Sequence, residues 1–120
     1  MNSLLSGRRM LVVEDEMLIR MTIEDMLADL GCESVTATGR ADKAVALVDR
    51  QVFDAALLDI NLNGGSSRAV ADALSAHGVP FVFATGNRGD LWDGFRDRAV
   101  LRKPFKHVEL VEILTHLLPR

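Results

Sequence analysis

The feature that most constrains this chain is a repeated alternation between short apolar runs and longer amphipathic segments. The continuous apolar run at 10–13 is typical of a strand buried on both faces, and residues 16–30 then place apolar side chains at helical spacing before Gly31. Further strands are predicted at 33–36, 54–59, 79–84 and 99–102, and further helices at 41–49, 67–77 and 106–118. Such strand–helix repeats predict an α/β fold, with a doubly wound parallel sheet covered by helices on both faces.

Within these segments, individual residues have predicted places. Met17, Met21 and Met26 share helical spacing and are expected to fill the core rather than to form a docking surface. Thr38 is predicted to cap the helix that follows it. The stretch 87–98 is polar and contains two glycines, so any helix there is expected to be short.

Length and composition narrow the class of protein. The 120 residues suffice for one domain, and 48% hydrophobic with 26% charged residues is typical of a globular chain. The net charge of −3 argues against direct nucleic-acid binding. Cys32 is the only cysteine, which excludes an intramolecular disulfide and fits a reducing compartment. Without a readable signal peptide or an apolar run of about 18 residues, we expect a cytoplasmic protein with no membrane partner.

Chemically distinctive residues follow the predicted strands. Ligands collect at the carboxyl ends of the strands in an open parallel sheet, so side chains at those positions should converge. Three carboxylates, one hydroxyl and one ammonium occupy them in this chain: Glu14, Asp15, Asp59, Thr85 and Lys103.

This set of side chains points to phosphoryl chemistry. Carboxylates packed together repel unless a cation holds them, and their hard oxygens suit Mg²⁺. A carboxylate beside such an ion can attack phosphorus in line and form an acyl phosphate. Lys103 would neutralise a phosphoryl oxygen, and Thr85 could hydrogen-bond another oxygen once the group is present.

Four short motifs resemble one family. LVVEDE at 11–16, LLDINL at 57–62, FVFATG at 81–86 and LRKPF at 101–105 are similar to the four signatures of the response-regulator receiver domain of two-component signalling. The resemblance implies a flavodoxin-like, five-stranded parallel sheet in the strand order 2-1-3-4-5, here with a shortened fourth helix. It also implies that residues 1–120 form a single receiver domain without an effector domain.

The resemblance assigns roles to the converging acidic residues. It implies that Asp59 is the phosphoacceptor and that Asp15 is a direct Mg²⁺ ligand. Glu14 would act on the metal partly through water, and Asn61 would offer its backbone carbonyl to it.

The remaining family positions concern the switch. Thr85 would be the switch hydroxyl, and Lys103 the phosphoryl-binding lysine, joined to Pro104 by a cis peptide bond. Receivers usually carry an aromatic residue three positions before this lysine, whereas this chain has Val100, so the usual threonine–aromatic relay cannot operate. We hypothesise that residues 87–98 are mobile before phosphorylation and become ordered afterwards.

The FVFATG motif and the trimmed fourth helix resemble a receiver subgroup with a Phe-Ala-Thr-Gly motif, whose members pair with histidine kinases of the HWE or related classes. The expected function is therefore that of a single-domain response regulator. It would take its phosphoryl group from a sensor histidine kinase, then bind a downstream protein or act as a phosphate sink toward a phosphotransfer protein. It would catalyse only its own phosphorylation and slow dephosphorylation, so we expect a signalling protein rather than an enzyme.

Three other functions are compatible with parts of the sequence. A degenerate receiver that binds partners without phosphorylation is the main alternative, although its acidic residues and lysine are intact. A dedicated phosphohydrolase needs a second carboxylate two residues after the nucleophile, where this chain has Asn61. A flavin or nucleotide binder is disfavoured because the first strand–helix loop carries acids in place of glycines.

Overall fold

The structure is a computed structural model that describes residues 4–62, 64–86 and 98–118. The described strands are β1 (Arg9–Val13), β2 (Ser34–Thr38), β3 (Ala55–Asp59), β4 (Phe81–Thr85) and β5 (Val100–Arg102). The described helices are α1 (Met17–Asp29), α2 (Ala41–Arg50), α3 (Ser67–Ala76) and α4 (His107–Leu117).

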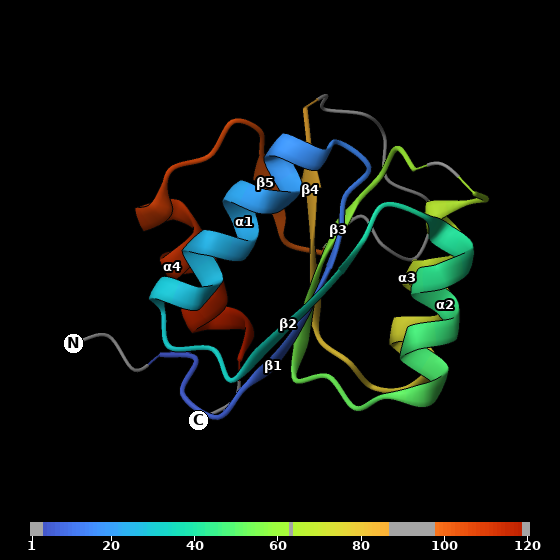
Figure 1. The fold of residues 1–120 in the computed structure, drawn as a ribbon, viewed down its shortest axis with the longest axis horizontal. Coiled ribbons are helices and arrows are strands. Elements are labelled where there is room, and N and C mark those ends of the chain that lie inside the picture. Colours follow the sequence, from blue (N-terminus) through green and yellow to red (C-terminus); the bar gives the residue numbers. More distant parts are fainter. Residues whose placement is uncertain (1–3, 63, 87–97, 119–120) are drawn as a thin grey trace.

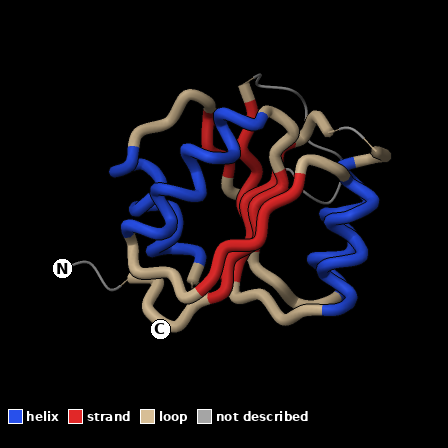
Figure 2. Tube along the Cα trace, viewed as in Figure 1, coloured by secondary structure: helices blue, strands red, loops and turns tan. Residues whose placement is uncertain are grey.

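The strands form one parallel sheet in the order β2-β1-β3-β4-β5 (Figure 2). The predicted fold class and strand order are therefore confirmed. All residues of β3 and β4 are buried, because central strands of a doubly wound sheet are covered on both faces. The three strands in the middle of the order, β1, β3 and β4, end at the same edge of the sheet.

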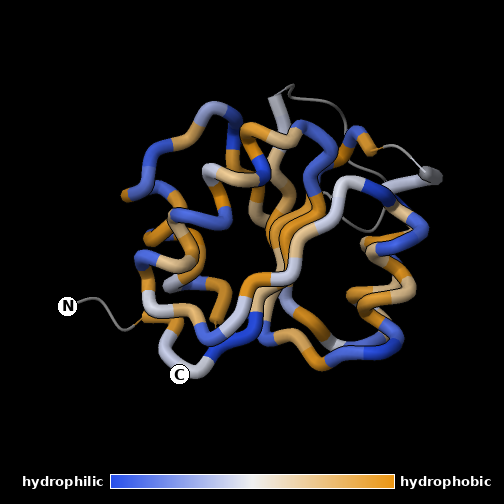
Figure 3. Tube along the Cα trace, viewed as in Figure 1, coloured by the Kyte–Doolittle hydropathy of each residue, from blue (hydrophilic) through white to orange (hydrophobic). Residues whose placement is uncertain are grey.

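Helices cover both faces of the sheet, with α1 and α4 on one side and α2 and α3 on the other (Figure 1). Two apolar clusters result. Leu11, Leu58 and Phe83 belong to the cluster that includes residues of α2 and α3. Val12 and Leu57 belong to the cluster that includes residues of α1 and α4. Alternate residues of each central strand thus belong to opposite layers, and Figure 3 shows hydrophobic residues concentrated in the strands at the middle of the sheet.

The ends of the elements differ from the predicted ends by one to two residues in most cases. The largest shifts are of two residues: β4 begins at Phe81 rather than at Val79, and β2 ends at Thr38 rather than at Thr36. Pro80 lies just before the strand, and its carbonyl accepts a hydrogen bond from Ala56 N at 3.0 Å. Gly31 and Gly78 follow α1 and α3 with φ of 87° and 69°, as expected of residues that end helices.

Two local predictions are wrong. Met17 and Met21 are 61% and 52% exposed rather than core-facing, because α1 turns Ile23 and Leu27 toward the sheet. Thr38 does not cap α2, because it is the last residue of β2. Its Oγ1 accepts a hydrogen bond from the N–H of Arg40, the residue that stands at the helix cap position, at 3.3 Å.

The predicted short fourth helix and its proposed ordering fall almost entirely on residues 87–97, outside the described residues. No helix in the ranges 4–62, 64–86 and 98–118 combines the length and apolar character needed to cross a bilayer.

Candidate active site at the carboxyl edge of the sheet

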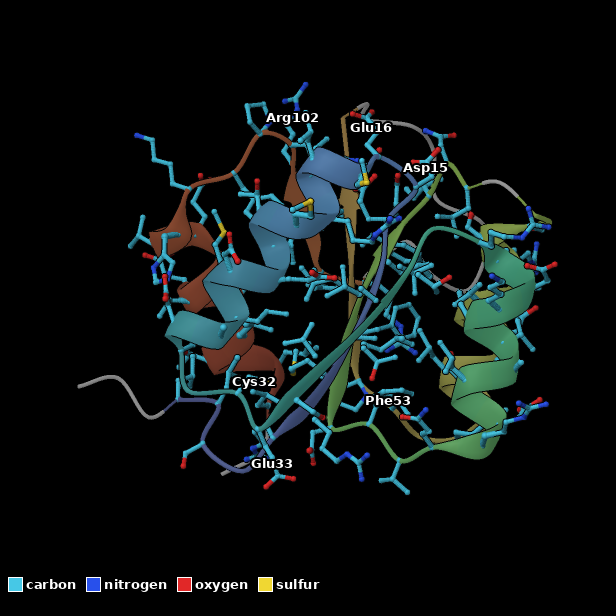
Figure 4. All side chains as sticks on the ribbon, in the orientation of Figure 1. Asp15, Glu16, Cys32, Glu33, Phe53 and Arg102 are labelled. Atoms are coloured by element: carbon cyan, nitrogen blue, oxygen red, sulfur yellow. The ribbon has the colours of Figure 1, made fainter. Side chains whose placement is uncertain are left out.

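The polar strand-end residues predicted to converge do lie together. Glu14 and Asp15 follow β1, Asp59 ends β3, and their carboxylate oxygens lie within 4.8 Å of one another. Glu14 and Asp59 are buried, and Asp15 is half-buried. In Figure 4, Asp15 and Glu16 lie at this edge of the molecule, whereas Glu33 and Phe53 mark the opposite edge.

Lys103 connects the acidic residues across the sheet. It follows β5, and its Nζ donates to Glu14 Oε1 at 2.6 Å and to Asp59 Oδ2 at 3.3 Å. The peptide bond to Pro104 is cis, as predicted. The backbone N–H of Lys103 donates to the carbonyl of Thr85, at the end of β4, at 2.8 Å. Thr85 is itself only 3% exposed, so β4 and β5 bring both residues to one edge.

Glu14 is fixed at both carboxylate oxygens. Oε1 accepts from Lys103, and Oε2 accepts from the backbone N–H of Glu16 at 3.1 Å. Its backbone N–H donates to the carbonyl of Thr38 at 3.0 Å, which ties the acidic loop to the end of β2. Each carboxylate oxygen of Glu14 therefore already accepts a hydrogen bond from another protein group.

Asp59 combines burial with a nearby like charge. Burial raises the pKa of Asp59 to about 7, and the carboxylate of Glu14 acts in the same direction. The N–H of Asn61, which donates to Asp59 Oδ1 at 3.1 Å, and the ammonium of Lys103 act against this rise in pKa. Near neutral pH the metal-free carboxyl is thus divided between its acid and its carboxylate form.

The pKa of Lys103 is raised as well, although burial acts on it in the opposite direction. Burial alone would lower the pKa of Lys103, but its hydrogen bond to Glu14 and the charges of Glu14 and Asp59 outweigh it and raise the pKa. The ammonium therefore stays charged and compensates part of the negative charge of the cluster.

The acidic cluster suits a divalent cation. Its donors are carboxylate oxygens, the ligands that Mg²⁺ prefers, and one compensating ammonium leaves net negative charge among three acids. The rise in the pKa of Asp59 shows that the buried carboxylate lacks enough positive charge around it. The residues present therefore fit the predicted metal.

A groove of about 640 Å³ opens the site to the surface. Asp59 and Lys103 line it, together with apolar side chains of α1 and of the segment after β5, among them Ile19, Ile23, Met26, Pro104 and Phe105. The sequence did not predict this groove, since the residues of α1 were expected to be covered by core.

The sequence reasoning also missed two polar supports of the loop residues. Ser67 is 4% exposed, and its Oγ donates to the carbonyl of Ile60, next to Asp59. Arg20 on α1 donates from Nη1 to the carbonyl of Glu14 at 2.9 Å. Both contacts join residues six or seven positions apart in the chain, but no short motif identifies them, because each depends on how the start of a helix folds back over the loop before it.

The chain matches known proteins over most of its length. The family model of the response regulator receiver domain matches residues 10–115. The transcriptional regulatory protein PdtaR of Mycobacterium tuberculosis is 33% identical over 109 residues, which are 87% of this chain and 53% of that protein. The chain thus spans about half the length of this curated relative.

Solved structures agree with this match. The receiver domain of the sensor histidine kinase PA1611 from Pseudomonas aeruginosa PAO1, which has a magnesium ion coordinated in its active site cleft, is 32% identical with a TM-score of 0.79. The alignment covers 93% of this chain and 98% of that domain. SdrG from Sphingomonas melonis Fr1 is 43% identical with a TM-score of 0.82, over 96% of this chain and 98% of SdrG, and its BeF3-activated conformation is also known. The chain therefore belongs to the response-regulator receiver domain family.

Proposed function

We propose that this receiver domain accepts a phosphoryl group on Asp59 in a Mg²⁺-dependent reaction. The observation that carries the proposal is the position of Asp59: a buried carboxylate in contact with Lys103, next to two further acids, in the lining of an open groove. Acids packed this closely are poor for stability and well suited to holding a cation and a phosphoryl group.

The residues would divide the work as follows. Asp15 and Asp59 would ligate the metal directly, with the backbone carbonyl of Asn61. Glu14 would act partly through water, which agrees with both of its carboxylate oxygens already accepting hydrogen bonds. Bound Mg²⁺ would supply neutralising charge for the oxygens of the transferred group.

The proposed step forms a mixed anhydride. A carboxylate oxygen of Asp59 attacks the phosphorus in line, the bond from phosphorus to the donor breaks, and the donor leaves with the electron pair. From a phosphohistidine, the leaving group is the imidazole nitrogen. Lys103 already touches Asp59 Oδ2, so a short movement brings its ammonium to a phosphoryl oxygen.

Thr85 is the proposed switch residue. It ends β4 beside Asp59, since the register pairs Asp59 with Ala84, and its carbonyl holds the N–H of Lys103. A hydroxyl at that position can hydrogen-bond the phosphoryl group only once it is present. The position of the usual aromatic partner is Val100, which is 42% exposed at the edge strand β5, so the signal must leave by another contact.

A direct test uses a small phosphodonor. We would incubate the wild type, Asp59→Asn and Asp72→Asn with acetyl phosphate, with and without Mg²⁺, and measure intact mass. Asp72 is an exposed aspartate on α3 and serves as the matched control. The proposal predicts one added phosphoryl group in the wild type and in Asp72→Asn, dependent on Mg²⁺ and lost in Asp59→Asn. An adduct that persists in Asp59→Asn would contradict the assignment of Asp59 as the acceptor. Absence of an adduct in every protein would contradict the proposal as a whole and favour a phosphorylation-independent binding module.

We further propose that the physiological donor is a sensor histidine kinase, of the HWE or a related class, and that the phosphorylated domain acts on a downstream protein or a phosphotransfer protein. The groove supports a protein donor, because Leu18 in its lining is an exposed apolar side chain, and Met21, one turn further along α1, is exposed as well. Transfer from a panel of autophosphorylated kinases, compared by initial rate, tests the class. Equal rates from all classes would contradict it.

A further inference from the structure

Gly39 occupies a position where limited space, rather than backbone conformation, favours glycine. The described glycines with positive φ are Gly7, Gly31, Gly64, Gly65 and Gly78, so Gly39 is not among them. A Cβ at Gly39 would lie 2.6 Å from Arg20 Nη1, 3.2 Å from Asp15 Cα and 3.3 Å from Glu14 O. The loop after β2 thus closes against both the acidic loop and the end of the Arg20 side chain.

Arg20 bridges these two loops. Its Nη1 donates to the carbonyl of Glu14 at 2.9 Å, while the space above Gly39 accommodates the guanidinium. The backbone N–H of Glu14 donates to Thr38 O from the other side. Among the residues that the structure describes, the donor to the carbonyl of the peptide that joins Glu14 to Asp15 is Arg20.

We propose that Arg20, seated on Gly39, is a positioning residue for metal binding: it fixes the Glu14–Asp15 peptide so that the carboxylate of Asp15 faces that of Asp59. The inference rests on the proposed function, since it concerns the same acidic site. Arg20 itself contacts a carbonyl and no carboxylate in the described contacts, so it acts through the backbone.

Two physical roles for Arg20 predict opposite results. If only its positive charge mattered, its removal would reduce repulsion and strengthen cation binding at the acidic cluster. If it positions the acidic peptide, its removal loosens the ligand geometry and weakens cation binding, as the loss of supporting residues does at other metal sites. The sign of the change in affinity therefore separates positioning from charge.

The experiment measures Mn²⁺ binding by the electron paramagnetic resonance of free Mn²⁺, with Mg²⁺ affinity obtained by competition. Arg20→Met should raise the dissociation constant about tenfold. Arg20→Lys, which keeps one donor and the charge, should restore part of the affinity. Arg50→Met, an exposed arginine at the end of α2, is the matched control and should leave the affinity within about twofold of wild type.

Gly39→Ala tests the seat of the guanidinium. In the wild-type background, its Cβ should displace the guanidinium of Arg20 and weaken Mn²⁺ binding. In the Arg20→Met background, where that guanidinium is absent, the same substitution should weaken Mn²⁺ binding less. Unchanged or tighter binding in Arg20→Met, or equal effects of Gly39→Ala in both backgrounds, would overturn the proposal. Absence of Mn²⁺ binding by the wild type would instead overturn the proposed function. Should Arg20→Met fail to fold, Arg20→Lys and Gly39→Ala each disturb the contact while the positive charge stays, so weaker Mn²⁺ binding by both supports positioning and unchanged binding overturns it.

Discussion

Neighbouring residues of β3 lie in two very different environments. Leu57 and Leu58 are buried among apolar side chains, one in each layer of the fold. The next residue, Asp59, is 4% exposed and lies beside a second carboxylate and an ammonium. The interior of the strand stabilises the fold, whereas its carboxyl end buries a carboxylate beside a like charge, and both effects raise the pKa of Asp59, burial the more strongly. The residues of β3 that stabilise the fold are therefore different from, and directly precede, the residue placed for chemistry.

If this separation of stability from chemistry holds, Lys103→Met should cause the largest loss in the rate of phosphorylation. We expect phosphorylation by acetyl phosphate to slow by about a hundredfold or more, because no ammonium remains to neutralise the phosphoryl oxygens. The initial rate by intact mass at saturating Mg²⁺ is the measurement, and Lys43→Met, an exposed lysine on α2, is the control. A rate within a few-fold of wild type would show that the lysine serves only the fold.

Leu58→Ala should have the converse effect. It removes a fully buried side chain beneath α2 and α3 and should lower the free energy of unfolding by about 2–5 kcal/mol. Phosphorylation should persist at temperatures where the variant stays folded. Val52→Ala, at a position 76% exposed, should change stability by less than about 0.5 kcal/mol. Loss of phosphorylation in folded Leu58→Ala would break the separation of the two regions.

The strand ends and helix ends could be predicted because apolar periodicity and turn residues determine them locally. The converging set Glu14, Asp59 and Lys103 could be predicted because parallel strands share a carboxyl edge. Periodicity did not reveal that Met17 and Met21 are exposed, since it identifies residues that share a face of a helix and not how that helix is rotated against the sheet.

The missed polar contacts have a different cause. Thr38 has the chemistry of a helix cap, but strand pairing with Val13 extended β2 through it. The approach of Arg20 to the loop around Gly39 joins positions that no local pattern relates. Local propensity contains no information on which loops a packed helix will contact.

A smaller effect is expected from two glycines, one at the carboxyl edge of the sheet and one at the opposite edge. Gly64 follows Asp59 in the loop at the carboxyl edge with φ of 77°, and a Cβ there would lie 2.9 Å from the Arg40 guanidinium. Gly78, before β4, has φ of 69° and no atom within 4 Å of such a Cβ. Both alanine variants should lose about 1 kcal/mol of stability from backbone strain.

Of the two variants, only Gly64→Ala should lose more stability than backbone strain explains, because the Arg40 guanidinium must move away from the new Cβ. Urea unfolding of the two variants, with Arg40→Ala added to each, measures the difference. If Arg40→Ala changes the cost of both alanine substitutions equally, the proposed crowding at Gly64 is wrong.

The most direct test of the account is the stability of wild type and Asp59→Asn, measured by urea unfolding from pH 5 to 8 with and without about 10 mM Mg²⁺. The pKa of Asp59 is about 7 in the folded protein against a usual 3.8, so its contribution to stability is present at low pH and lost as pH rises through 7. Without Mg²⁺, we predict that Asp59→Asn is more stable than wild type by about 1–3 kcal/mol at pH 8 and loses this advantage toward pH 5. Mg²⁺ should narrow the gap by stabilising the wild type more. A wild type that is the more stable protein at pH 8 without Mg²⁺, or equal stabilisation of both by Mg²⁺, would contradict the account.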